Sequence, residues 1–120
     1  MQVSLPIPSF DLLLYYNREM RILLWTNHSR FKMRQHRLSE SRVKRVLNHP
    51  QRIEGGIADK TLALMQTSGS EKHPYEIWVM VEDTPGKRKV ISTWRYPGET
   101  KPGEPLPEKI VKEFREASRF

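Results

Sequence analysis

Two long runs of β-branched and aromatic residues, joined by the short sequence TPGK, place the strongest constraint on the fold of this chain. The runs are YEIWVMVED and KRKVISTWRY, and such residues at this density are typical of strands. Because Pro followed by Gly marks a tight turn, the two runs predict an antiparallel β-hairpin. A third run, TLALMQT, precedes them and predicts a further strand of the same sheet.

The turn also predicts which residues face each other across the hairpin. An even-numbered loop centred on Pro85 and Gly86 pairs the strands as follows: Val81 with Val90, Val79 with Ser92, Ile77 with Trp94 and Tyr75 with Tyr96 on one face, and Met80 with Ile91, Trp78 with Thr93 and Glu76 with Arg95 on the other. A one-residue bulge would change this register.

The segment before residue 50 has a helical pattern instead. MRILLWT predicts a buried strand, and NHSRFKMRQHR follows it with helix-compatible residues and neither Gly nor Pro. A second helix is marked by Ser39 as its N-cap, by the spacing of Leu38 and Val43, and by Pro50, which ends it. Two adjacent helices are therefore expected after the first strand.

The two ends of the chain predict extra elements. Ser9 can cap a short helix that runs to about Arg18, although LLLYY is equally compatible with a strand. A Pro/Gly-rich connector over 97–107 leads into a C-terminal helix over 107–118, with an apolar stripe of Ile110, Val111 and Phe114. This helix could dock on the sheet or bind a partner.

These elements predict one α+β domain over residues 1–120, with a core at about 20–96. We expect an antiparallel sheet of about four strands, a two-helix hairpin on one face, and additional N- and C-terminal helices.

Charge is concentrated in one third of the chain. The net charge is +7, and residues 18–52 hold ten Lys or Arg residues against two acidic ones. A positive field of this kind attracts phosphates, so nucleic acid is the leading partner, with an acidic protein second. The absence of Cys fits a reducing cytoplasm. The N-terminus does not read as a signal peptide, and the longest apolar run, Leu12–Tyr16, is too short for a membrane span, so a cytoplasmic protein is expected.

One stripe of the first helix has the residue types of an acid–base site. His28, Lys32 and His36 are four residues apart, so on a helix they share a face. Lysine can bind a phosphate while a neutral imidazole transfers a proton near pH 7, and RNA cleavage through the 2′-hydroxyl requires no metal. Without an acidic residue in the stripe, no metal site is expected, and no cofactor motif occurs. The alternative is the polar face of a surface helix.

The end of the last strand, STWRY, holds a second candidate set. Arg95 could stabilise a transition state, Tyr96 could stack on a base or act as an acid, and Trp78 could provide a stacking surface. Alternatively, Arg95 forms an ion pair with Glu76 and Tyr96 lies in the core. Phosphate contacts are expected from cations of the helical region, namely Arg30, Arg34, Arg37, Arg42, Lys44 and Arg45, which could also be an ordinary solvated helix face.

The segment TNHSRFKMRQHRLSESRVKRVLNHPQRI is similar to a family of small bacterial and phage domains of unknown function, whose motif is His-x-x-x-Arg-Met. The matching positions are Thr26, His28, Met33, Ser39, Val43, Val46, Leu47 and Pro50, with Lys32 in place of the motif's Arg. That family resembles the RelE/ParE toxin superfamily, in which two helices cover one face of an antiparallel sheet.

RelE-like members of that superfamily cleave mRNA without metal, using basic residues and sometimes a Tyr or His on the open sheet face, whereas ParE-like members bind gyrase. The resemblance therefore implies a toxin or toxin-derived RNA-binding domain, with mRNA endoribonuclease activity as one form. Its partners would be RNA or the ribosome and a small acidic antitoxin. A non-catalytic domain that binds an acidic protein or nucleic acid is the alternative.

Overall fold

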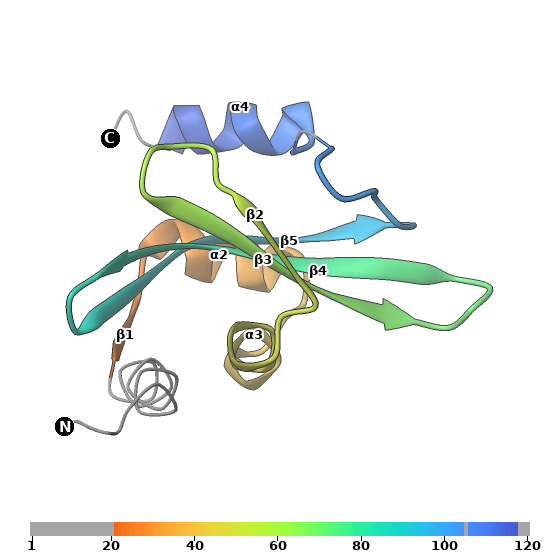
Figure 1. Cartoon of the computed structure of the whole chain (residues 1–120), viewed down its shortest axis with the longest axis horizontal. Coiled ribbons are helices and arrows are strands. Elements are labelled where there is room, and N and C mark those ends of the chain that lie inside the picture. Colours follow the sequence, from red (N-terminus) through yellow and green to blue (C-terminus); the bar gives the residue numbers. More distant parts are fainter. Residues whose placement is uncertain (1–20, 105, 118–120) are drawn as a thin grey trace, which may run out of the picture.

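The computed structural model describes residues 21–104 and 106–117, which form a five-stranded sheet with helices on both faces (Figure 1). The strands are β1 (Ile22–Trp25), β2 (Arg52–Gly55), β3 (Thr61–Gly69), β4 (Pro74–Thr84) and β5 (Lys87–Pro97), in the order β1-β5-β4-β3-β2. The helices are α2 (Asn27–Gln35), α3 (Glu40–Asn48) and α4 (Glu108–Ala117). The N-terminal element expected up to Arg18 lies outside the described residues.

The predicted α+β class is confirmed, but the sheet is mixed and larger than expected. β1 pairs with β5 in parallel, and the other strand pairs are antiparallel. The additional strand is β2, formed by the residues just before Gly56. The sequence pattern did not indicate this strand, because only Ile53 of its four residues is a large hydrophobic residue.

The expectation of a buried first strand is wrong. β1 lies at one edge of the sheet, where Ile22 is 59% and Leu24 40% exposed. Leu23 and Trp25 point to the opposite face and pack on the core beneath the helices. A strand at the edge buries only the side chains that a covering layer reaches, so an entirely apolar run does not ensure burial on both faces.

Helices α2 and α3 begin where hydroxyl side chains accept hydrogen bonds from their first turns. Thr26 Oγ1 accepts from the backbone N–H of Ser29 at 3.0 Å, and Ser39 Oγ accepts from that of Arg42 at 3.1 Å, as predicted for Ser39. Arg37 joins the two helices with a φ of 56°, in the left-handed region that usually takes glycine. Both helices pack on one face of the sheet, where Val43, Val46, Leu64 and Val79 are buried.

A β-bulge changes the predicted register of the β4–β5 hairpin. Val81 pairs with Val90 as predicted, but the next pair is Met80 with Ser92, so Ile91 is the extra residue of β5. All later predicted pairs are therefore wrong by one residue. The expected ion pair between Glu76 and Arg95 does not form, because Glu76 lies opposite Tyr96.

The shift reassigns the faces of the end of β5. Trp94 now lies beside Trp78, and their rings stack with centroids 6.0 Å apart. Tyr75 and Tyr96, which were expected to pair, belong to the two separate core clusters on opposite faces of the sheet.

The predicted C-terminal helix is confirmed, and it docks on the sheet face opposite α2 and α3. Ile110 is buried against Trp94 and the neighbouring apolar residues, and Phe114 packs beside it. The sheet therefore lies between two layers of helices, as Figure 1 shows for α3 and α4. No helix in the described ranges is long and apolar enough to cross a membrane.

A buried carboxylate fastens the connector before α4 to the sheet. Glu76 is 1% exposed, and its Oε2 accepts a hydrogen bond from the backbone N–H of Thr100 at 2.9 Å. Its Oε1 accepts from Thr100 Oγ1 at 2.8 Å and from Trp78 Nε1 at 2.9 Å. Arg52 of β2 donates to the Thr100 carbonyl at 2.9 Å, so three separate segments meet at this carboxylate.

Replacing this carboxylate should destabilise the fold. Glu76→Gln puts an N–H₂ group where N–H and O–H donors converge, so we expect the free energy of unfolding to fall by about 1–3 kcal/mol. Glu82→Gln is the matched control on the same strand, because its ion pair with Lys89 is partly exposed and 3.5 Å long, and its cost should stay below about 1 kcal/mol. Urea unfolding measures both changes, and equal costs would contradict the role given to Glu76.

Candidate nucleic-acid interface

The predicted stripe of His28, Lys32 and His36 lies on the side of α2 that faces α4. Lys32 is 2% exposed and forms an ion pair with Glu113, which is on α4. His28 and His36 both lie within the electrostatic reach of Lys32 and Glu113. Lys32 in the middle of the stripe is therefore covered by α4, and His28 and His36 are half-buried rather than on a fully solvated helix face.

His36 covers the free edge of β5 where β1 has ended. Its Nδ1 accepts a hydrogen bond from the backbone N–H of Arg95 at 3.3 Å. A neutral imidazole that accepts at Nδ1 carries its proton on Nε2. Nε2 is buried and has no hydrogen-bond partner among the described residues. The N–H group at Nε2 therefore has no hydrogen-bond acceptor within the described residues.

The surroundings of both histidines lower their pKa values. Burial is the main cause for each, and the charge of Lys32 adds to it, while Glu113 partly offsets the shift. Arg95 and Lys109 lower the pKa of His36 further. Both imidazoles are therefore neutral at pH 7.

Arg95 closes the C-terminal end of α2. Its Nε and Nη2 donate to the carbonyl of His36 at 3.3 and 3.1 Å, which satisfies a carbonyl that the helix leaves free. The guanidinium lies over the ring of Tyr75, 4.6 Å from its centroid. The backbone N–H of Arg95 therefore bonds the His36 ring, and its side chain bonds the His36 carbonyl.

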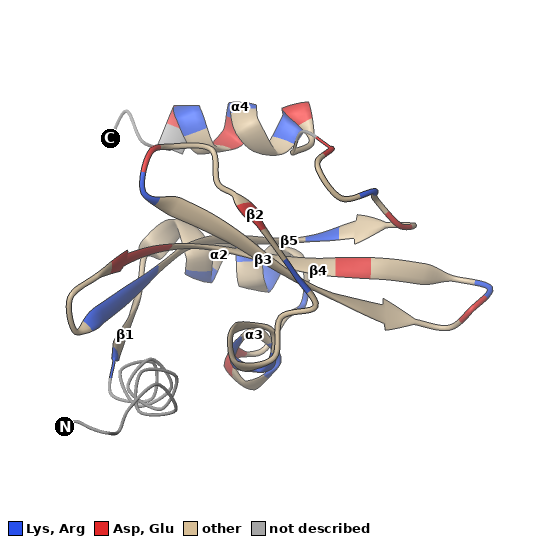
Figure 2. Ribbon diagram, viewed as in Figure 1, with Lys and Arg blue, Asp and Glu red and all other residues tan. Residues whose placement is uncertain are grey.

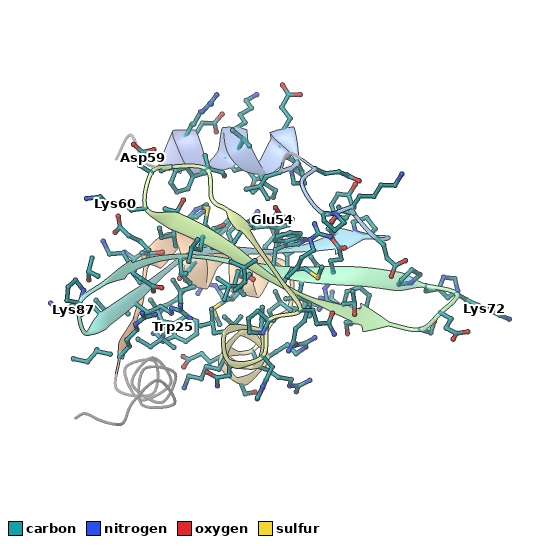
Figure 3. The ribbon with its side chains drawn as sticks, in the orientation of Figure 1. Trp25, Glu54, Asp59, Lys60, Lys72 and Lys87 are labelled. Atoms are coloured by element: carbon teal, nitrogen blue, oxygen red, sulfur yellow. The ribbon has the colours of Figure 1, made fainter. Side chains whose placement is uncertain are left out.

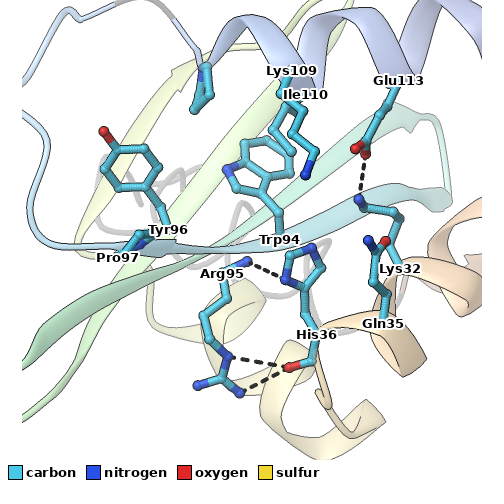
Figure 4. A pocket seen from close by; sticks show the side chains of 11 residues that line it. Lys32, Gln35, His36, Trp94, Arg95, Tyr96, Pro97, Lys109, Ile110 and Glu113 are labelled. Atoms are coloured by element: carbon cyan, nitrogen blue, oxygen red, sulfur yellow. Dashed lines mark hydrogen bonds and ion pairs between the residues drawn. The ribbon is translucent and has the colours of Figure 1, made fainter.

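A cavity of about 240 Å³ opens between α2, β5 and α4, and we refer to it as the α4 pocket (Figure 4). It is lined by Lys32, Gln35, His36, Trp94, Arg95, Tyr96, Pro97, Pro107, Lys109, Ile110 and Glu113. The structure thus brings together four of the five predicted catalytic residues, with His28 near the pocket but not among its lining residues. Trp94 and the α4 residues were not expected there, since the register and the docking of α4 could not be deduced.

A second cluster lies on the other face of the sheet, beside α3. Burial is the main cause that lowers the pKa of Arg42, and the nearby charges of Arg45 and Arg95 lower it further. The pKa of Tyr75 is lowered first by a hydrogen bond to Ser68 and then by Arg95 and Arg42. We refer to Arg42, Arg45, Arg95 and Tyr75 as the arginine cluster. Sequence reasoning missed Tyr75, because the unbulged register placed Tyr96 rather than Arg95 on the same face of the hairpin.

Gln66 of β3 forms hydrogen bonds that orient Arg42 and tie the end of α3 to the sheet. Arg42 Nη1 donates to Gln66 Oε1 at 2.7 Å. The amide nitrogen of Gln66 donates to the carbonyls of Arg45 and His49 at 3.1 and 2.8 Å, which satisfies the end of the helix. A neutral amide therefore orients Arg42 without cancelling its charge.

The other predicted contact residues have different surroundings. Arg34, Arg37, Lys44 and Arg45 are exposed, and Figure 2 shows basic positions along α2 and α3. Arg30 is also exposed, but it forms an ion pair with Glu40 at 3.1 Å. Trp78 is only 3% exposed and lies between Trp94 and the guanidinium of Arg52, 5.1 Å from its ring, so both of its faces are covered.

Groups of three or more His, Asp or Glu side chains that could hold a metal ion do not occur in the part of the chain that the structure describes. Comparison of the chain with protein-family models, with curated proteins and with solved structures finds no match.

The lowered histidine pKa values predict a loss of stability in mild acid. As pH falls below about 6.5, the unfolded chain takes up protons before the folded one, so the free energy of unfolding decreases. Each unit by which a pKa is lowered corresponds to about 1.4 kcal/mol at most. NMR titration of the imidazoles together with urea unfolding at pH 7 and pH 5.5 measures this. A pKa above 6.5 for either histidine would contradict the prediction.

Proposed function

We propose that this chain is a RelE-like toxin or toxin-derived domain that binds RNA through the arginine cluster. One observation carries the proposal: within the described residues, none of Arg42, Arg45 and Arg95 forms an ion pair with a carboxylate. Arg21, Arg30, Arg52 and Arg88, by contrast, each pair with an acidic side chain. The cluster therefore keeps its full positive charge.

The geometry of the cluster suits a phosphate backbone. Arginine donates from a planar fork that matches phosphate oxygens, and Arg42 and Arg95 are already oriented by neutral partners, so little side-chain entropy is lost on binding. Arg37 and Lys44 are exposed elsewhere in the same helical region. Contacts of this type position RNA without reading its sequence. An acidic antitoxin would bind the same surface in competition with RNA.

Charge reversal tests this proposal. Arg42→Glu should weaken binding of single-stranded RNA about tenfold or more and reduce the salt dependence of binding by about one phosphate contact. Lys60→Glu is the control with the same charge change, since Lys60 lies in the loop after β2, far from α3 (Figure 3). Fluorescence anisotropy at several salt concentrations measures both. Equal losses for the two variants would mean that only net charge matters and that the cluster is not the site.

A metal-independent endoribonuclease activity is the catalytic form of this proposal. The lowered pKa of Tyr75 makes its phenol a candidate base for the 2′-hydroxyl, while Arg42 and Arg95 hold the phosphate. The Tyr75 phenolate takes the proton of the 2′-hydroxyl, the 2′-oxygen attacks phosphorus, and the bond to the 5′-oxygen breaks. The 5′-oxygen takes a proton from water, and the hydroxide so formed takes the proton from Tyr75. Among the residues predicted from sequence, Lys32 is paired with Glu113 and His36 Nδ1 is engaged, which favours the arginine cluster as the reacting centre.

Two tyrosine variants distinguish the possible centres. Tyr75→Phe should lower RNA cleavage in EDTA by about 100-fold and leave RNA binding nearly unchanged, because it removes only the proton acceptor. Tyr96→Phe makes the same change in the α4 pocket and should leave cleavage unchanged. Gel analysis of labelled RNA, with detection of the 2′,3′-cyclic phosphate product, gives the rates. If the wild-type chain binds RNA but does not cleave it, the non-catalytic alternative holds.

A further inference from the structure

The α4 pocket contains polar groups that the fold itself leaves without partners. Trp94 is fully buried, and its Nε1–H has no hydrogen-bond acceptor among the described residues. The Nε2–H of His36 is also buried and likewise has no acceptor within the described residues. Both side chains line the pocket (Figure 4). Buried N–H groups without acceptors are rare and costly, so two in one cavity indicate a missing acceptor.

The charges of the pocket indicate an anion as that acceptor. Two lysines, Lys32 and Lys109, line it against the single carboxylate of Glu113, while the guanidinium of Arg95 is directed to the His36 carbonyl. Lys32, almost completely buried, has Glu113 as its ion-pair partner, and Glu113 belongs to α4 rather than to the sheet. Burying a lysine is costly unless an anion accompanies it. The pocket therefore has an excess of positive charge even with the carboxylate in place.

We propose that the α4 pocket is a binding site for a phosphate group, in which the carboxylate of Glu113 occupies the place on Lys32 that a phosphate oxygen takes. The phosphate accepts hydrogen bonds from Lys32 and from the two N–H groups, and Lys109 neutralises part of its charge. A phosphate offers several acceptor oxygens, so it satisfies all three donors together, which a single carboxylate oxygen does not. Arg95 borders both this site and the arginine cluster, but the proposed phosphate contacts come from Lys32, His36, Trp94 and Lys109, so the proposal does not depend on the proposed function.

Binding requires a movement of α4. His36 Nε2 and Trp94 Nε1 are shielded from solvent, and α4 residues Lys109 and Ile110 line the same cavity. Beyond Thr100, which Glu76 fastens to the sheet, the connector that carries α4 contains Gly103 with a φ of 84°, in the region where glycine is preferred. A phosphate that displaces Glu113 from Lys32 shifts α4 outward about this connector.

The three tryptophans of the chain provide a direct measurement. In ¹H–¹⁵N spectra of the full chain, inorganic phosphate should move the indole resonance of Trp94 saturably, since its N–H gains an acceptor. The indole of Trp78 is the internal control, because Glu76 already accepts its hydrogen bond at 2.9 Å. Sodium chloride at matched ionic strength controls for screening. A Trp94 resonance that does not respond to phosphate overturns the proposal.

Variants of α4 test the roles of individual charges. Glu113→Gln removes the competing carboxylate and should raise the affinity for inorganic phosphate about tenfold. Lys109→Ala should lower it about threefold to tenfold, whereas Lys112→Ala, the same change on the same helix but outside the pocket lining, should not. Both lysines are exposed, so neither change threatens the fold. Unchanged or weaker affinity in Glu113→Gln, or equal effects of the two lysine variants, overturns the site.

A third comparison identifies the source of the phosphate group. Tighter binding of a 5′-phosphorylated than of a 5′-hydroxyl oligouridylate supports a terminal phosphate of RNA, and equal binding supports an internal phosphodiester. A Trp94 response to inorganic phosphate alone supports a small phosphorylated molecule. In Arg42→Glu, the Trp94 response should persist although RNA binding by the arginine cluster is weakened. This separates failure of the pocket from failure of the proposed function.

Discussion

One extra residue in β5 decides where the chemistry of this domain lies. Because Ile91 has no partner on β4, every side chain after it changes face relative to a regular hairpin. Arg95 thereby joins Tyr75 and Arg42 on the side of α3, and Trp94 stacks on Trp78 under α4. Without the bulge, Arg95 would pair with Glu76, and the carboxylate that now fastens the connector would be used elsewhere.

The contact between His36 and Arg95 links the two sides of the sheet. On the side of β1, β5 has no neighbouring strand beyond Val90 within the described residues, and the imidazole accepts the N–H that would otherwise be exposed at this edge. The guanidinium returns a pair of hydrogen bonds to the His36 carbonyl. One residue pair thus ends α2, protects the edge of β5, and lies between the arginine cluster and the α4 pocket.

The cations of the domain differ in how they are compensated. Lys32 is buried with a carboxylate, and Arg30 is paired at the surface, whereas Arg42 and Arg95 are held by an amide, a carbonyl and an aromatic ring. Neutral partners orient a cation without reducing its charge. Arg34, Arg37 and Lys44 likewise form no ion pair within the described residues, so the arginine cluster differs from them in that neutral partners orient Arg42 and Arg95 in advance.

Local patterns were sufficient to predict the elements and several of the site residues. The N-cap at Ser39, the end of α3 before Pro50, the TPGK turn and the C-terminal helix each depend on residues close together in the chain, and all were found. The spacing of His28, Lys32 and His36 likewise predicted a shared helix face, which the structure places towards α4. β2 and the exposure of β1 were not predicted, because neighbouring strands and covering layers decide them.

The sequence by itself therefore determined an α+β domain with a strongly basic helical segment and a set of candidate site residues. Only the tertiary structure decided which of those residues meet. A bulge at Ile91 leaves no clear mark in a run of strand-forming residues, because its cost and benefit come from packing across the sheet. The pairing of Lys32 with Glu113 joins residues 81 positions apart, and it exists because the apolar stripe of α4 has the uncovered face of the sheet as its nearest place of burial.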